Sequence, residues 1–136
     1  MKSLAFMGML LFSISSYAQK DTSYSNIDMI IIKNGHVEEA LYYYDQNWKM
    51  LREKAVEAGY IESYQFLQAL EEPGYDLLLI TNYGNRSNFE HREENFQKLM
   101  DKYQPDGVKL LNDIPSSEFR AFGPGTTAKA LARSKD

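Results

Sequence analysis

The sequence predicts an α+β domain of the ferredoxin-like type, in which a four-stranded antiparallel sheet carries two helices on one face. The first observation is the order of its apolar segments over residues 26–123, which is strand, helix, strand, strand, helix, strand. Right-handed crossovers fold that βαββαβ order into one sheet with both helices on the same side. The second is that 136 residues, 43% hydrophobic and 25% charged, suit a single globular domain.

The first strand and the first helix follow from residues 26–58. Residues 26–35 form a β-branched run that ends in Asn34-Gly35, which indicates a buried strand and a turn. Residues 36–58 predict a long helix, with Gly59 at the position of a left-handed C-terminal cap. Its apolar residues recur every three or four positions in a stripe about 120° wide. These residues are Val37, Ala40, Leu41, Tyr44, Trp48, Leu51, Ala55 and Ala58.

The middle of the chain predicts a hairpin. Residues 60–70 and 75–84 are two apolar runs, and the turn sequence EEPG at 71–74 separates them. A last short strand is expected over residues 116–123. Residues 124–136 are expected to be a polar C-terminal tail.

The second helix begins at a capping box. Ser87 is expected to cover a backbone N–H while Glu90, three residues later, reaches back. Pro105-Asp106-Gly107 ends the helix. Its apolar side consists of Phe89, Phe96, Leu99, Met100 and Tyr103.

Residues 1–18 have the pattern of a secretory signal peptide. Lys2 precedes an apolar run over 4–14, and Ser16 and Ala18 are the small residues of a cleavage site. The run is too short for an ordinary transmembrane helix. We therefore expect a periplasmic or secreted protein without a stable membrane anchor, in which a flexible segment, 19–25, precedes the domain.

Two features predict a homodimer. The chain has no cysteine, so an exported fold must be held by its core or by a partner chain. The apolar runs 29–32 and 77–80 do not alternate with polar residues, which indicates strands buried on both faces. Because two helices cover one face only, a second copy of the chain is expected on the other.

Charge and motifs exclude several functions. The net charge of −4 is dispersed and leaves no basic stripe, so nucleic acid is not an expected partner. The sequence has no dinucleotide-binding glycine motif, no P-loop and no serine-hydrolase motif. No cofactor is predicted.

Three segments carry a resemblance to a known family, namely IIIKNGHVEEAL, EAGYIESYQFLQALEEPGYDLLLITNYGN and SNFEHREENF. Over residues 26–122 the chain resembles the dimeric α/β-barrel superfamily, and within it domains related to antibiotic-biosynthesis monooxygenases. The resemblance implies two sheets packed face to face, with a small molecule held between each sheet and its helices. Cofactor-free quinone oxygenases, isomerases and haem-degrading enzymes belong to this superfamily. The Asn, Trp and His of the haem-degrading members correspond to Asp28, Tyr83 and Met100, so haem degradation is not implied.

The candidate ligand-binding residues are Tyr44, Trp48, Thr81 and Tyr83. Tyr44 and Trp48 lie in the apolar stripe, where rings usually form core, although buried rings can also line a pocket. Thr81 and Tyr83 share one face of the third strand. The first hypothesis is therefore an exported homodimer that binds an apolar or aromatic small molecule between sheet and helices.

The second hypothesis is a cofactor-free monooxygenase or isomerase that acts on a phenolic or quinone-like substrate. Asp28 would be the base, and Tyr83 or Tyr64 would orient the substrate. In the simpler interpretation, Asp28 is a solvated residue at a strand end. A third hypothesis is a structural or accessory subunit of an envelope assembly, with Tyr42, Tyr43 and Met50 as the contact surface.

Two histidine–glutamate pairs are the only metal candidates. Glu39 follows His36 and Glu94 follows His91 by three residues, a spacing that can hold a metal on one helical turn. If both helices start at the same end of the sheet, the pairs come together. The four side chains fall on polar helix faces, so no metal site is predicted.

Overall fold

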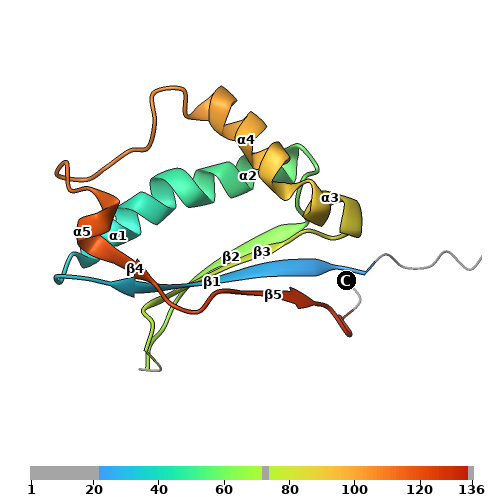
Figure 1. The fold of residues 1–136 in the computed structure, drawn as a ribbon, viewed down its shortest axis with the longest axis horizontal. Helices are drawn as coiled ribbons and strands as arrows, with labels where there is room; N and C mark the ends of the chain where they lie inside the picture. Colours follow the sequence, from blue (N-terminus) through green and yellow to red (C-terminus); the bar gives the residue numbers. More distant parts are fainter. Residues whose placement is uncertain (1–21, 72–73, 135–136) are drawn as a thin grey trace, which may run out of the picture.

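The computed structural model describes residues 22–71 and 74–134, which form an antiparallel sheet with helices packed on one side (Figure 1). The predicted α+β class is confirmed. The predicted strand number of four is wrong, because the described residues form five strands. The proposed signal peptide lies outside the described residues.

The strands of the sheet are ordered β2-β3-β1-β4, and β5 also pairs with β1. β4 pairs with residues 30–32 of β1, and β5 with residues 24–27, so the two short strands share one edge. The strands are β1 Tyr24–Ile32, β2 Ser63–Gln68, β3 Leu77–Asn82, β4 Arg120–Phe122 and β5 Thr126–Lys129.

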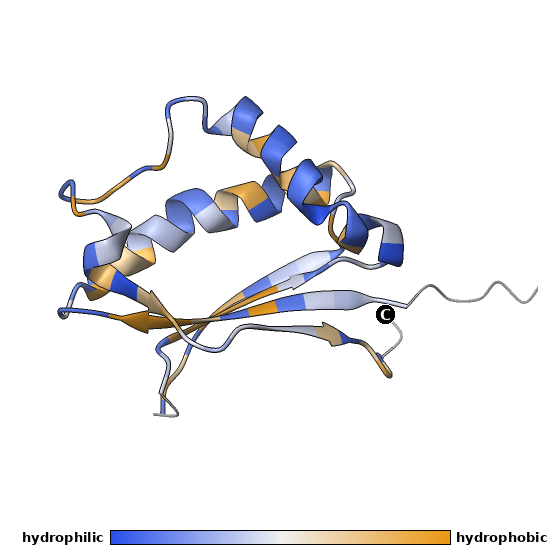
Figure 2. Cartoon of the chain, in the orientation of Figure 1, coloured by the Kyte–Doolittle hydropathy of each residue, from blue (hydrophilic) through white to orange (hydrophobic). Residues whose placement is uncertain are grey.

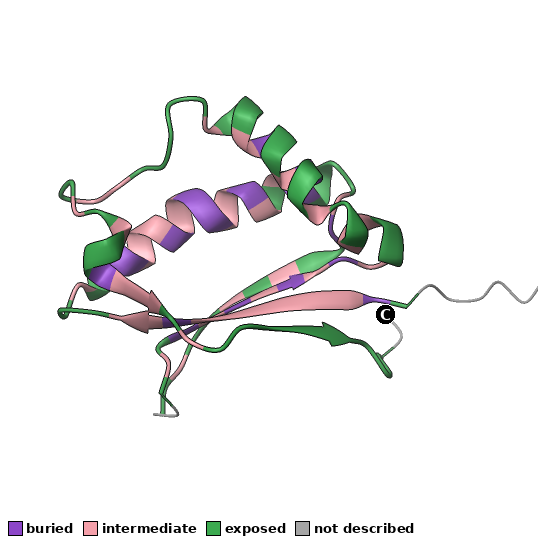
Figure 3. Cartoon of the chain, in the orientation of Figure 1, coloured by how far each residue is buried: buried purple, intermediate pink, exposed green. Residues whose placement is uncertain are grey.

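β5 lies in the segment expected to be a polar tail. All of its residues are exposed, so no apolar alternation marks it in the sequence (Figure 3). Its backbone pairs with β1 in antiparallel register, from Tyr24↔Lys129 to Ile27↔Thr126. Backbone pairing therefore accounts for this strand.

The predicted helix over 36–58 is a continuous run of three elements: α1 Val37–Tyr43, the π-helical η1 Tyr44–Lys49, and α2 Met50–Glu57. Asn47 in η1 is buried, and its Nδ2 donates to the carbonyl of Tyr43, 2.9 Å away. That carbonyl is the acceptor of the Asn47 backbone N–H in a regular α-helix, so the side chain occupies a place in the helical ladder. Gly59 follows α2 with a φ of +74°, in the left-handed conformation predicted for it.

Asn47 also holds the chain that follows α4. Its Oδ1 accepts from the backbone N–H of Lys109 (2.8 Å) and from Gln104 Nε2 (3.2 Å), and its Nδ2 donates to the Lys109 carbonyl (2.8 Å). One buried amide thus joins the first helix to the connection towards α5 (Ser116–Phe119).

The second predicted helix is interrupted at His91. It consists of α3 (Arg86–Glu90) and α4 (Arg92–Tyr103). The cap is Asn85, whose Oδ1 accepts from the Asn88 backbone N–H at 2.8 Å, and not Ser87, which lies inside α3. The N-cap therefore lies two positions before the predicted one.

The last predicted strand is also shorter than expected. Residues 116–119 form the helical turn α5, and only residues 120–122 form β4. Phe119 at the end of α5 is buried and packs against the ring of Tyr43, with 5.4 Å between ring centroids. Phe119 is therefore buried from a helical turn, although its apolar character had suggested a strand.

The core between the helices and the sheet has two parts. The first, here called the η1 cluster, is centred on Ile30, Tyr44, Trp48, Leu77 and Leu79. The second, here called the α4 cluster, is centred on Leu51, Ala55, Ile61, Tyr83 and Leu99, with Phe89, Phe96 and Met100 packed against it. The buried residues of α1, η1 and α2 connect the two along the length of the sheet (Figure 3).

The sheet face away from the helices is largely aliphatic. Strand alternation and the β1–β3–β2 register place Ile27, Met29, Ile31, Leu67, Leu78 and Ile80 on it. Apolar residues thus occupy both sides of the central strands, and α4 is mostly hydrophilic by comparison (Figure 2). None of the helices in the described ranges is both long and apolar enough to cross a membrane.

Candidate functional site

A cavity of about 500 Å³ lies in the α4 cluster, where α2 and α4 face the ends of β1 and β3. We call it the α4 cavity. Leu51, Phe96 and Met100 form its apolar walls. Its polar lining consists of Asn26, Arg52, Tyr83, Arg92, Glu93 and Gln97.

Arg52 is the most constrained charge in this cavity. Its guanidinium carbon lies 4.4 Å from the ring centroid of Trp48 and 4.2 Å from that of Phe96. Its Nε donates to Thr81 Oγ1 at 3.2 Å. Burial lowers the pKa of Arg52 to about 10, so the side chain is still charged at neutral pH. Within residues 22–71 and 74–134, no carboxylate lies within ion-pair distance of it.

Asn26 and Tyr83 form the sheet side of the cavity. Asn26 Nδ2 donates to Tyr83 Oη at 3.1 Å. Asn26 Oδ1 is buried and, in the part of the chain that the structure describes, has no hydrogen-bond partner. Burial raises the pKa of Tyr83, and the nearby charge of Arg52 partly opposes that rise. The sheet side of the cavity therefore combines the neutral hydroxyl of Tyr83 with an acceptor oxygen of Asn26 that is buried behind the cavity surface and has no partner among the described residues.

Arg92 brings a second cation to the cavity from the first turn of α4. Its guanidinium carbon lies 4.3 Å from the ring centroid of Phe89, and its Nη1 donates to the Phe89 carbonyl at 2.8 Å. Glu93 and Gln97, one turn apart on α4, are exposed and also line the cavity. The cavity therefore reaches the protein surface beside α4.

The predicted ligand-binding residues fall into two places. Tyr83 lines the α4 cavity, and Thr81 and Trp48 contact Arg52 there. Tyr44 lies in the η1 cluster, where its Oη accepts from Arg120 Nη1 at 3.0 Å. Burial raises the pKa of Tyr44, and the hydrogen bond from Arg120 opposes the rise.

Asp28, the proposed base, does not line the α4 cavity. It is half-buried on the helix-facing side of β1, directly across from Leu79 of β3. Its Oδ1 lies 3.3 Å from the position that a Cβ on Gly125 would occupy, in the chain between β4 and β5. One oxygen of the Asp28 carboxylate thus lies beside the chain between β4 and β5, and Asp28 acts on Arg52 and Tyr83 of the cavity only through its charge.

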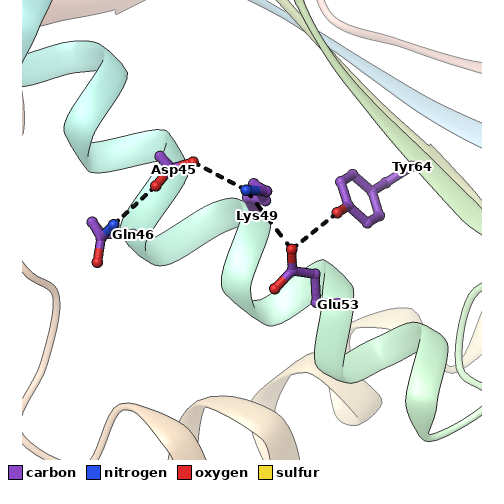
Figure 4. A network of polar contacts seen from close by, with 5 residues as sticks. All are labelled: Asp45, Gln46, Lys49, Glu53 and Tyr64. Atoms are coloured by element: carbon purple, nitrogen blue, oxygen red, sulfur yellow. Dashed lines mark hydrogen bonds and ion pairs between the residues drawn. The ribbon is translucent and has the colours of Figure 1, made fainter.

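Tyr64, the other proposed catalytic residue, belongs to a surface network. Its Oη donates to Glu53 Oε1 at 3.3 Å, and Lys49 lies between Glu53 (3.8 Å) and Asp45 (3.3 Å) (Figure 4). Burial raises the pKa of Tyr64, and the charge of Glu53 adds to the rise. The Tyr64 ring packs edge-on against Trp48, with 5.8 Å between centroids. The Tyr64 hydroxyl therefore interacts with charged residues on the helix surface and does not line the cavity.

The two histidine–glutamate pairs do not come together. α1 and α3 begin at opposite ends of the sheet, which contradicts the expected common end (Figure 1). His36 lies 3.6 Å from Glu39, whereas His91 contacts the Ser87 carbonyl and Glu94 pairs with Lys98. Among the residues described by the structure, no three acidic or histidine side chains converge on a point suited to a metal ion.

Sequence reasoning missed five of the six polar residues of the cavity, namely Asn26, Arg52, Arg92, Glu93 and Gln97. One signal was available for Arg52, which follows Trp48 by four residues and therefore lies on the same helical face. No comparable signal marks Asn26, because one uncharged residue at the start of a strand is unremarkable in sequence. Its place beside Tyr83 depends on the pairing of β1 with β3.

Comparison with models of known protein families yields no match to this chain, and comparison with curated proteins yields none either. Function is therefore inferred from the cavity, from its charges and from the contacts of the residues around it.

Proposed function

We propose that the protein is an exported homodimer that binds a small aromatic molecule in the α4 cavity. The observation that carries this proposal is the cavity itself, because about 500 Å³ lies within the range typical of small-molecule sites. Its composition adds support. Apolar walls from Leu51, Phe96 and Met100, with a few convergent polar groups, are what such sites use for affinity and orientation.

The geometry favours binding over the alternative of a cofactor-free oxygenase or isomerase. That alternative needs the substrate beside its base, and neither Asp28 nor Tyr64 lines the cavity. Tyr83 does line it, but burial raises the pKa of its hydroxyl and keeps it protonated. Tyr83 is therefore suited to hydrogen bonding with a ligand rather than to proton abstraction.

The strand order supports the ferredoxin-like arrangement and the resemblance to dimeric α/β barrels. β1 and β3 are central and antiparallel, with β2 and β4 outside them, as a split βαβ arrangement requires. β5 is an addition at the β1 edge.

The outer face of the sheet is the proposed dimer interface. Its six aliphatic residues are accompanied on the same strands by Ser25, Ser63, Gln65, Asn82, Ala121, Thr126 and Ala128, none of which is charged. An uncharged apolar face of this kind is suited to burial against a second copy.

Sedimentation of two charge variants tests the dimer. Ile80 is central on this face, so Ile80→Lys is expected to convert a dimer to a monomer. Val56→Lys is the matched control, because Val56 is 42% exposed on α2, far from the outer sheet face. A wild-type protein that sediments as a monomer at all concentrations would reject the interface.

The export part of the proposal rests on residues 1–18. We expect mature protein from the native host to begin at Gln19 and to be recovered outside the cytoplasm. Intact mass spectrometry of cell fractions measures both. Uncleaved chain confined to the cytoplasmic fraction would contradict export.

The binding proposal is tested with a panel of neutral one-ring and two-ring aromatic molecules in ligand-observed NMR. Gln97→Phe places a ring at the cavity mouth and is expected to weaken binding by about tenfold or more, since it removes space rather than fold. Glu94→Phe is the control, because Glu94 is exposed on the same helix and does not line the cavity. If no aromatic compound binds, or if both variants behave alike, the α4 cavity is not the site.

A further inference from the structure

Arg52 is a charged group in an unfavourable place. Its guanidinium lies between two aromatic rings and beside apolar walls, where removal of water from a cation is costly. Stacking on Trp48 and Phe96 offsets part of this cost. Asp28 and Tyr83 influence the pKa of Arg52 only electrostatically, through space. No carboxylate in the described ranges forms an ion pair with Arg52.

The donors of Arg52 are only partly used. Thr81 accepts the hydrogen bond from Nε. Among the hydrogen bonds of residues 22–71 and 74–134, neither Nη1 nor Nη2 of Arg52 takes part in one. Because Arg52 lines the cavity and its guanidinium is planar, its remaining N–H groups offer a fork of donors there. Such a fork matches the two oxygens of a carboxylate.

The other charges of the cavity favour an anion. Arg92 is a second cation among the lining residues, and Glu93 is the one acidic group among them. Glu93 is exposed at the mouth, where water screens its charge, whereas Arg52 is half-buried among rings. Tyr83 Oη adds a neutral donor on the sheet side.

We infer that the ligand is a small aromatic carboxylic acid, whose carboxylate pairs with the Nη groups of Arg52 while its ring lies among Leu51, Phe96 and Met100. This inference rests on the proposed function, and it adds the chemical class of the ligand. Arg52 is the specificity-determining residue, because it separates the acid from a neutral molecule of the same shape.

Matched pairs of compounds test the inference. Phenylacetate and 2-naphthylacetate are compared with their primary amides, and acetate alone is the third arm. Trp48 is the only tryptophan of the chain and stacks on Arg52, so its fluorescence reports on the site directly. We expect each acid to bind at least about tenfold more tightly than its amide, the size of effect that a charge-assisted hydrogen-bond pair gives.

Three variants separate the charge from the packing. Arg52→Met keeps the length of the side chain without the charge and is expected to remove the preference for the acid while the amide still binds. Arg52→Lys keeps the charge without the fork and is expected to recover only part of the preference. Arg120→Met is the control, because Arg120 also stacks on aromatic rings but belongs to the η1 cluster. It is expected to leave the affinities unchanged.

The outcomes separate this inference from the proposed function. If acids and amides bind equally, or if Arg52→Met retains the preference for acids, the carboxylate class is rejected and aromatic binding stands. If acetate binds as tightly as the aromatic acids, the site is an anion site and the aromatic function is rejected. If none of the compounds binds, both proposals are overturned. Comparison of acid and amide on the unaltered protein remains decisive even where a variant does not fold.

Discussion

The η1 cluster and the α4 cluster use the same kinds of residues, but the α4 cavity, which opens to the protein surface, lies in the α4 cluster. Each contains an arginine among aromatic rings. The guanidinium carbon of Arg120 lies 4.8 Å from the ring centroid of Tyr43, and its Nη1 donates a hydrogen bond to Tyr44 Oη. Arg120 therefore interacts with other residues of the protein. Arg52 is held in a similar way by Trp48 and Phe96 but opens onto the cavity. An arginine among aromatic rings therefore has a structural role in the η1 cluster, whereas in the α4 cluster it contributes to the surface of a cavity.

The buried amides of the two regions show the same difference. Asn47 beside the η1 cluster uses both polar atoms of its side chain, which bond to Tyr43, Gln104 and Lys109. Asn26 at the α4 cavity uses Nδ2 alone, and its buried Oδ1 has no partner in the described part of the chain. Among the residues that the structure describes, the buried side-chain atom without a partner thus lies beside the α4 cavity.

The largest difference between the two clusters is expected when one leucine is truncated in each. Leu79→Ala in the η1 cluster is expected to cost about 2–5 kcal/mol of unfolding free energy, because it opens a void in a filled core. Leu51→Ala is expected to cost clearly less, since Leu51 already faces the cavity. Urea denaturation measures both changes. Equal losses would mean that the two clusters are packed alike.

The next largest difference is expected between the two asparagines. Asn47→Ala leaves both backbone polar groups of Lys109 without their buried partner and is expected to cost about 1–3 kcal/mol. Asn26→Leu removes an acceptor that has no partner together with one hydrogen bond, from Nδ2 to the Tyr83 hydroxyl, and is expected to cost about 1 kcal/mol. The same denaturation experiment compares them. A loss at Asn26 as large as that at Asn47 would show that Oδ1 of Asn26 is satisfied in solution.

The arginine pair gives a smaller stability difference. Arg120→Met removes the donor to the buried Tyr44 hydroxyl and is expected to cost about 1 kcal/mol. Arg52→Met replaces a desolvated cation with an apolar side chain of similar length and is expected to be neutral or mildly stabilising. Thermal unfolding without ligand is the measurement. A large loss at Arg52 would indicate that stacking on Trp48 and Phe96 is the main role of that residue.

The two clusters also explain which parts of the molecule were predictable. The α+β class and the first long helix follow from apolar periodicity. The periodicity is clear because the helix face that packs against the sheet, with Tyr44, Trp48 and Leu51, must be apolar. β5 was missed because backbone pairing with β1 accounts for it and its side chains are exposed. Residues 116–119 were mistaken for a strand because a buried Phe119 suits either a strand or a helical turn.

The candidate site was predicted only where it coincides with the apolar pattern. Tyr83 and Trp48 lie on faces that alternation or helical spacing identifies, whereas Tyr44 on the same stripe lies in filled core. Arg52 and Asn26 depend on which strand ends lie under α2, which is a long-range property of the sheet. Periodicity describes one element at a time and therefore cannot distinguish the filled end from the hollow one.

The smallest expected effect concerns the two buried tyrosines at alkaline pH. Burial raises the pKa of both Tyr44 and Tyr83 above the ordinary value of 10.0, so the folded protein keeps protons that the unfolded chain releases. Their contribution is therefore complete below pH 10 and is lost as the pH rises through the folded-state pKa. The lowered pKa of Arg52 acts in the opposite direction over the same range, because there the unfolded chain holds the additional proton.

Tyr44→Phe and Tyr83→Phe measure this contribution in each cluster. Each is expected to reduce the loss of unfolding free energy above pH 10. The reductions should be similar, since both side chains are buried and each has a nearby arginine that opposes the rise of its pKa. Urea midpoints on either side of pH 10 give the values. A clearly smaller effect at Tyr83 would mean that water reaches its hydroxyl through the cavity.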